Sequence, residues 1–110
     1  MKVLLLEDNL MWSVRTVRGL ETLGHTVALV SRSAGEYPDA DLAIVNLSAR
    51  AFDPYTAVAA LKKKGIKTIG HVGHKEKEVW EKGERAGCDK VVSNGSLAKR
   101  LEAVIDEATR

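Results

Sequence analysis

The sequence predicts one α/β domain, in which a five-stranded parallel sheet is covered by helices on both faces. Short apolar runs and amphipathic segments alternate five times along the 110 residues, an order typical of right-handed βαβ units. The clearest apolar run begins at Leu42 and stops at a polar residue, Asn46, as expected of a strand buried on both faces. Ligands of open parallel sheets gather beyond the carboxyl ends of the strands, so the surroundings of Asn46 are informative about function.

The composition is that of an ordinary globular domain spanning residues 1–110. Hydrophobic residues make up 45% and charged residues 29% of the chain, so disorder is not indicated. The net charge of +2 comes without the concentrated basic face of a nucleic-acid-binding protein. The apolar run Met1–Leu6 is too short for a signal peptide or a membrane span, and the lone Cys88 excludes an internal disulfide. We therefore expect a cytoplasmic protein that binds neither nucleic acid nor a membrane.

The first strand is predicted over Val3–Leu6, where four apolar residues precede an acidic turn. Either Asp8 or Asn9 can cap the following helix, because a side-chain oxygen accepts from a free backbone amide there. Leucine and valine residues at helical spacing extend this helix, and Gly24 ends it.

A second strand is predicted over Thr26–Val30, and a third over Leu42–Leu47. The segment 31–40 between them contains Ser, Gly and Pro without apolar periodicity, so it holds one helical turn at most. The next helix begins at Asp53, which acts as its cap before a proline at the first helical position, and it ends at Gly65.

Two strands and two helices complete the pattern. Ile66–Val72 is a fourth strand, and Lys75–Ala86 is a helix with a thin apolar face. A short fifth strand at Val91–Val92 precedes a turn. Ser96 is the expected cap of one last amphipathic helix, whose apolar residues lie within Leu97–Ala108.

Nearly from end to end, the chain resembles the receiver domain of two-component response regulators. Four segments carry the resemblance: Val3–Asn9, Leu20–His25, Asp41–Asn46 and Ala86–Val92. In order, they are similar to the family's first strand with its acidic pair, the end of its first helix, its phosphoacceptor strand and the approach to its fifth strand. The resemblance implies a doubly wound, flavodoxin-like sheet of order 2-1-3-4-5, with a site where the first and third strands diverge.

In that family the acidic pair holds Mg²⁺, an aspartate on the third strand accepts a phosphoryl group, and a hydroxyl and a lysine contact its oxygens. Glu7 and Asp8 match the acidic pair, so the resemblance implies no cofactor beyond a weak, residual Mg²⁺ at these two residues. The three other chemical positions differ from the family, and they fall at Asn46, at Val72 or its neighbour His71, and at Asn94.

These differences predict a pseudo-receiver with no enzymatic activity. An aspartate attacks phosphorus through an anionic oxygen, whereas the amide of Asn46 has its lone pair delocalised. Without the lysine, the charge of an incoming phosphoryl group has no fixed counter-ion, and phosphoryl transfer depends largely on such electrostatics. We therefore expect a signalling and protein-interaction module that works independently of phosphorylation.

A second difference from the family lies between the second and third strands, where a helix is shortened or missing. Part of one sheet face would then be thinly covered, and exposed apolar patches often mark contact surfaces. We expect this face to be covered either by the loop that contains Tyr37 or by another subunit.

Two features remain open to more than one interpretation. The pocket that contains Glu7, Asp8, Asn46 and Asn94 could instead sense a small ligand, an anion or a metal ion, and a phosphoacceptor at some other residue is a third alternative. The partner would be a signalling protein or a second copy of the chain. In receivers the face near the fourth helix and fifth strand often docks partners, which makes Trp80 and Val91 interface candidates.

Overall fold

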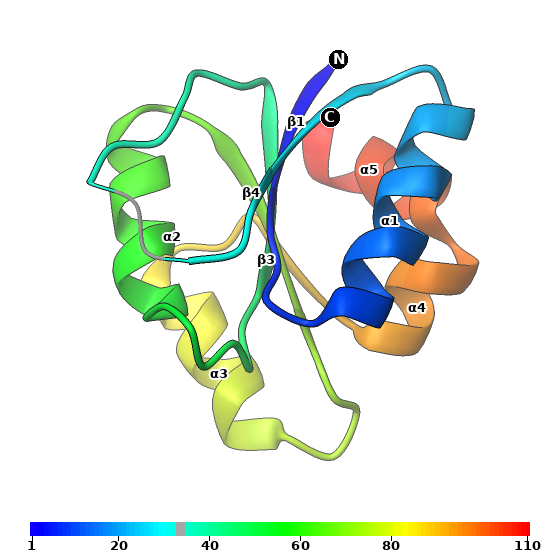
Figure 1. Cartoon of the computed structure of the whole chain (residues 1–110). Coiled ribbons are helices and arrows are strands. Elements are labelled where there is room, and N and C mark those ends of the chain that lie inside the picture. The colour runs from blue at the N-terminus through cyan, green and yellow to red at the C-terminus, as the bar shows by residue number, and fades with distance from the viewer. Residues whose placement is uncertain (33–34) are drawn as a thin grey trace.

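Five parallel strands form the centre of the computed structural model, which describes residues 1–32 and 35–110 (Figure 1). The strands are β1 (Lys2–Leu6), β2 (Thr26–Val30), β3 (Leu42–Asn46), β4 (Lys67–Val72) and β5 (Lys90–Ser93). The helices are α1 (Leu10–Thr22), α2 (Pro54–Lys63), α3 (Lys77–Ala86), α4 (Asn94–Lys99) and α5 (Leu101–Thr109). Strands and helices alternate as the sequence predicts. None of the helices described here combines the length and the apolar character that crossing a membrane requires.

The strands lie in the order β2-β1-β3-β4-β5, and every neighbouring pair is parallel. The predicted order 2-1-3-4-5 is therefore confirmed. The register brings Leu6 beside Val45, and Asn46 beside His71. The carboxyl ends of β1, β3 and β4 consequently meet at one edge of the sheet, where a site of this fold is expected.

Helices cover both faces of the sheet (Figure 1), and an apolar core lies on each face. One lies under α2 and α3, and it contains Leu6, Val45 and Leu61. The other lies under α1, α4 and α5, and it contains Leu5 and Ile44. Alternate residues of β1 and β3 thus point to opposite cores, which explains why both strands read as continuous apolar runs.

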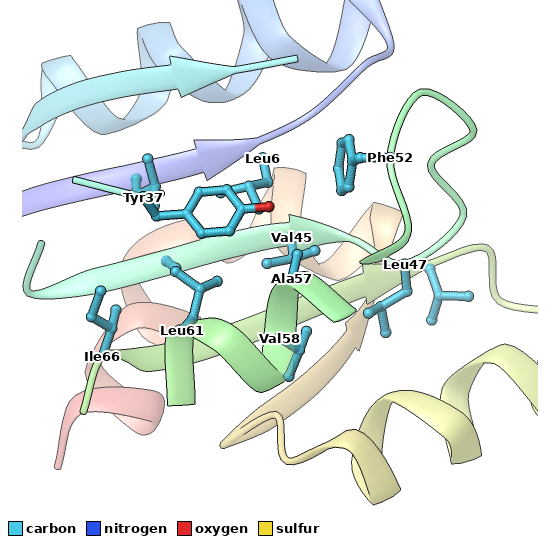
Figure 2. Close-up of a cluster of buried hydrophobic side chains, with 12 residues drawn as sticks. Leu6, Tyr37, Val45, Leu47, Phe52, Ala57, Val58, Leu61 and Ile66 are labelled. Atoms are coloured by element: carbon cyan, nitrogen blue, oxygen red, sulfur yellow. The ribbon is translucent and has the colours of Figure 1, made fainter. Parts of the chain in front are cut away.

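The helix expected to be shortened or missing is absent from the described residues between β2 and β3. Residues Ser33 and Ala34 of this segment lie outside the description. Tyr37 is only 9% exposed, and Figure 2 shows its ring among Leu6, Val45 and Leu61. Of the two covers proposed for this face, the loop with Tyr37 is the one that the fold provides.

Side-chain caps begin three of the helices. Asn9, one of the two candidate caps, accepts a hydrogen bond from the amide of Trp12 at the start of α1. Asp53 accepts from the amides of Tyr55 and Thr56, with Pro54 at the first position of α2, as predicted.

The carboxyl-terminal region differs from the prediction. Ser96 is not the cap. The hydroxyl of Ser93 accepts a hydrogen bond from the Ser96 amide, so the cap lies three residues earlier than expected and α4 begins at Asn94. Residues 94 and 95 form its first turn instead of a separate turn. The expected single helix is divided at Arg100, whose φ of −125° and ψ of 33° interrupt the helical backbone. Leu97 and Leu101 keep a spacing of four across the break, so the apolar pattern alone does not reveal it.

Candidate functional site

Four polar side chains meet at the carboxyl edge of the sheet, each supplied by a different element. Glu7 follows β1, Asn46 ends β3, His71 lies in β4, and Asn94 is the first residue of α4. Glu7 and His71 are each 1% exposed, and Asn46 is 8% exposed. Burial of this kind requires that the polar groups satisfy one another.

Glu7 is the centre of this cluster. Its Oε2 accepts hydrogen bonds from Asn46 Nδ2 at 2.6 Å and from the backbone amide of Asn9 at 3.2 Å. Its Oε1 lies 2.8 Å from His71 Nε2. Both carboxylate oxygens are therefore engaged by N–H groups of the same chain. These hydrogen bonds offset the loss of water that burial of the Glu7 side chain causes.

His71 links Glu7 to Asn94. Its Nδ1 lies 2.6 Å from the side-chain oxygen of Asn94, while Nε2 faces Glu7. Oxygen atoms therefore face both ring nitrogens, and the imidazole is held between Glu7 and Asn94. The indole of Trp12 lies against the ring, with the two centroids 6.4 Å apart and the planes tilted by 56°.

Asp8 turns away from Glu7 and holds a loop. Its Oδ2 accepts hydrogen bonds from the backbone amides of Arg50 at 2.7 Å and Ala51 at 3.0 Å. Partial burial alone would raise the pKa of Asp8, but these amides and the Arg50 charge hold it below its usual value. The two acidic residues thus serve different purposes, although they are adjacent in the sequence.

Asn46 joins this cluster to the loop that follows β3. Its amide nitrogen donates to Glu7, and its Oδ1 accepts from the backbone amide of Ser48 at 2.9 Å. The Ser48 hydroxyl in turn donates to Glu76 Oε2 at 3.0 Å, and the same oxygen accepts from the Gly73 amide. One amide side chain therefore uses both its donor and its acceptor to connect strand ends.

The structure brings together most of the site residues predicted from the sequence, with one exception. Val72 is fully buried in the apolar core under α2 and α3, whereas the alternative residue, His71, lies in the polar cluster. Side chains alternate across a strand, so a shift of one residue moves the position to the other face. Two further candidates, Trp80 and Val91, are partly buried and pack against the same apolar core as Val72.

A small pocket of about 310 Å³ opens beside the cluster. It is lined by Asp8, Asn9, Trp12, Asn46, Ser48, Arg50, Glu76 and Asn94. Among the described residues, no three His, Cys, Asp or Glu side chains gather as a metal-binding group. Mg²⁺ prefers free carboxylate oxygens, whereas both oxygens of Glu7 here accept hydrogen bonds from N–H groups. The donor set therefore does not fit a Mg²⁺ ion as it stands.

No model of a known protein family matches the sequence, and none of the curated proteins matches it either. Solved structures do match. The signal receiver domain of a modulated diguanylate cyclase from Desulfovibrio desulfuricans G20 superposes with a TM-score of 0.82 at 23% identity, over 98% of this chain and 92% of that one.

Two further structures are similar over almost their whole length. The receiver domain of a sensor histidine kinase from Pseudomonas aeruginosa PAO1, with a magnesium ion in its active site cleft, gives a TM-score of 0.84 at 18% identity, over 98% of this chain and 96% of that chain. A CheY-like receiver domain protein from Methanospirillum hungatei JF-1 gives 0.76 at 19%, over 97% and 94%. The chain has the receiver fold. At the carboxyl edge of its sheet, Asn46, His71 and Asn94 form a chain of hydrogen bonds with Glu7.

Proposed function

We propose that this receiver fold is a cytoplasmic signalling module that binds a protein partner without being phosphorylated and without catalysing a reaction. The observation that carries the proposal is the hydrogen bond from Asn46 to Glu7. At the position where the family's acceptor stands, the side chain is an amide, and its nitrogen is occupied by the carboxylate beside it. Such an arrangement offers no anionic oxygen for attack on phosphorus.

The electrostatics of the pocket support the same proposal. At the position that corresponds to the family's lysine stands Asn94, a neutral amide whose oxygen faces His71 Nδ1. The other ring nitrogen of His71 faces Glu7, so neither side chain directs a fixed positive charge at the place of a phosphoryl group. Transfer of a phosphoryl group needs such a charge at the developing anion.

Intact mass spectrometry after incubation with acetyl phosphate and Mg²⁺ tests this proposal. We expect the mass of the protein to stay unchanged, while a receiver domain that retains its aspartate gains a phosphoryl group under the same conditions. A stable phosphoryl-sized gain on this chain would contradict the proposal, and peptide mapping would then identify the residue modified.

A second candidate function is an anion or small-ligand sensor, which the pocket of about 310 Å³ favours because the Arg50 side chain lines it together with Asn46 and Asn94. Trp12 lines the same pocket, so its fluorescence reports binding there. Titrations with inorganic phosphate and with Mg²⁺ separate the two functions. We expect no saturable change up to about 10 mM, a range in which a weak carboxylate site for Mg²⁺ would begin to fill.

A further inference from the structure

The strongly exposed large hydrophobic residues of the described chain gather around one edge of the sheet. They are Leu10 (79% exposed), Met11 (72%), Leu29 (50%), Val14 (45%) and Met1 (42%). Three lie on α1, one lies on β2, and the carbonyl of Met1 accepts a hydrogen bond from the β2 amide of Thr26. Monomers rarely expose contiguous apolar patches of this kind without a binding role. We call Leu10, Met11, Val14 and Leu29 the α1–β2 patch.

The α1 residues of the patch and Leu29 of β2 lie on the same face of the sheet. On α1, Gly19 faces Leu101 of α5, and Trp12 faces His71, so this side of the helix points toward the interior strands and α5. Leu10 and Val14 are about half a helical turn away from these positions and therefore lie on the side nearest β2. Val27 packs in the core under α1. Residues two apart in a strand point to the same face, so Leu29 lies on the α1 side of the sheet as well.

Among the strands that the structure describes, β2 lies at an edge of the sheet and pairs with β1 alone. The amide of Thr26 donates to Met1, and the carbonyl of Val30 accepts from Glu7. In a parallel ladder the alternate residues bond to the same neighbour, so the backbone groups of Val27 and Leu29 point outward. Proteins usually protect such an edge with a charge, a proline or a bulge, yet β2 contains only threonine, valine, alanine and leucine.

We propose that β2 pairs in an antiparallel manner with β2 of a second copy of this chain, which gives a two-fold dimer with one continuous sheet. In the register centred on Ala28, the outward backbone groups of Val27 meet those of Leu29 of the partner subunit, and the reverse pair forms by symmetry. The same two-fold axis places the two α1 helices side by side on one face of the sheet. A stable interface buries about 1,200 Å² or more of surface, which the pairing of two short strands does not reach. The apolar residues of the two α1 helices add to the buried surface.

The charges of α1 also favour a second copy. The helix carries two arginines, Arg15 and Arg18, and one acidic residue, Glu21, near its carboxyl end. Antiparallel packing brings Glu21 toward the amino-terminal half of the other helix, where Arg15 and the positive end of the helix dipole lie. An acidic helix of another protein would satisfy the arginines but would leave the strand edge unpaired, and the test below separates these two cases.

Sedimentation velocity of the full chain over a range of concentrations tests the dimer. We expect a concentration-dependent dimer for the unchanged protein, and at least a tenfold higher dissociation constant for Leu29→Lys, because a lysine on the edge strand must be buried at the two-fold axis. Ala59→Lys, on the exposed side of α2 across the sheet, is the matched control and should leave the dimer intact. Circular dichroism verifies that both variants fold.

Amide hydrogen exchange provides a second measurement that needs no variant. The amides of Val27 and Leu29 should be protected at high concentration and lose protection on dilution, whereas those of Ala28 and Val30 should stay protected in both conditions. A monomer at every reachable concentration would overturn the proposal. A dimer of unchanged affinity in Leu29→Lys would also overturn it, and so would amide protection at Val27 and Leu29 that does not change on dilution. None of these results bears on phosphorylation, so this inference and the proposed function can fail separately.

Discussion

Asn46 at the end of β3 and Glu7 after β1 are joined by a 2.6 Å hydrogen bond from the amide nitrogen to the carboxylate. This bond occupies the amide of Asn46 and one oxygen of Glu7, so neither group is free to react. Glu7 needs donors around it because it is buried, and Asn46 is the only one of its three hydrogen-bond partners described here that stands on β3. An acidic side chain at position 46 would therefore turn a stabilising contact into a repulsive one.

We expect Asn46→Asp to destabilise the fold and not to create a phosphoacceptor. At neutral pH the new carboxylate would lie against that of Glu7, and two like charges in a buried site oppose each other. Urea denaturation should give a free energy of unfolding lower by about 2–3 kcal/mol. The deficit should shrink as the pH falls below about 5, because protonation of one carboxyl removes the repulsion.

The same variant tests the rest of the pocket. Treated with acetyl phosphate and Mg²⁺, it should show no gain in mass, since Asn94 and His71 still supply no charge to a phosphoryl group. Phosphorylation of the variant would show that position 46 alone blocks the reaction. In that case the residues at positions 71 and 94 would not prevent phosphorylation.

Removal of the His71 imidazole should lower the free energy of unfolding more than a substitution at the surface does. His71→Ala leaves the buried Oε1 of Glu7 without its hydrogen-bond partner and opens a cavity, and together these losses should cost about 2–4 kcal/mol of unfolding free energy. The control is His74→Ala, since His74 is exposed only three residues away and should leave stability within about 0.5 kcal/mol of the original. Equal effects of the two substitutions in urea denaturation would show that the Glu7–His71 pair does not support the fold.

The lowered pKa of Asp8 predicts that the stability of the fold depends on pH. The pKa of Asp8 is lowered in the folded protein, so its contribution is present above the ordinary value of 3.8 and is lost as the pH falls through the folded-state pKa. Compared with Asp8→Asn, the original protein should be more stable by roughly 1 kcal/mol at pH 7, because a charged acceptor strengthens the bonds from the Arg50 and Ala51 amides. Denaturation curves at pH 7 and pH 3 should show this advantage shrinking.

The matched control is Asp106→Asn, which changes an exposed carboxylate on α5. It should stay close to the original protein at both pH values. If Asp8→Asn behaves in the same way as this control, the amide contacts of Asp8 contribute nothing to the stability of the loop.

Most of the fold could be predicted because the strands leave a strong signal. Three of the five described strands, β1, β3 and β4, contain runs of at least four residues buried on both faces of the sheet. In β1 and β3 most of these residues are apolar and adjacent in the sequence. The absence of a helix from the described residues between β2 and β3 could also be predicted, because the segment 31–40 lacks apolar periodicity. The break at Arg100 was not, because apolar residues continue at helical spacing on both sides of it.

The candidate site shows where this kind of prediction loses precision. Glu7, Asp8, Asn46 and Asn94 follow from the resemblance, but the choice between His71 and Val72 depends on the register of β4 to a single residue. A side chain at position 70 would face Leu47, so its neighbour His71 points to the opposite side of the sheet. The role of Asp8 also escaped prediction, since its partners are backbone amides of a loop that no sequence pattern marks.

Cys88 should be inert in the folded protein. Burial and, to a smaller extent, the Asp89 carboxylate raise the pKa of its thiol to about 11, so the reactive thiolate is scarce at pH 8. A thiol reagent such as DTNB should therefore label the native protein far more slowly than the urea-unfolded chain. Equal labelling rates in the two states would show that the loop at Gly87 opens freely.

Gly70 predicts a steric conflict within the sheet. A Cβ atom at this position would lie 2.6 Å from Leu47 Cδ1 and 3.0 Å from Cys88 Sγ, both of which are closer than packing allows. Because Leu47 is buried and cannot move aside, Gly70→Ala should lower the free energy of unfolding by about 1–3 kcal/mol. Gly95→Ala is the control, since no atom lies within 4 Å of its Cβ position and alanine favours helix α4 by about 0.5–1 kcal/mol.

A double variant shows whether Leu47 is the cause. Leu47→Ala alone should cost about 2–5 kcal/mol through lost packing, but it removes the side chain that obstructs a Cβ at position 70. The combination of Leu47→Ala with Gly70→Ala should therefore be less destabilised than the sum of the two single variants, because contacting residues couple. Additive losses in urea denaturation would mean that Gly70→Ala acts through the backbone or through Cys88, and the small residue next to His71 would then need a different explanation.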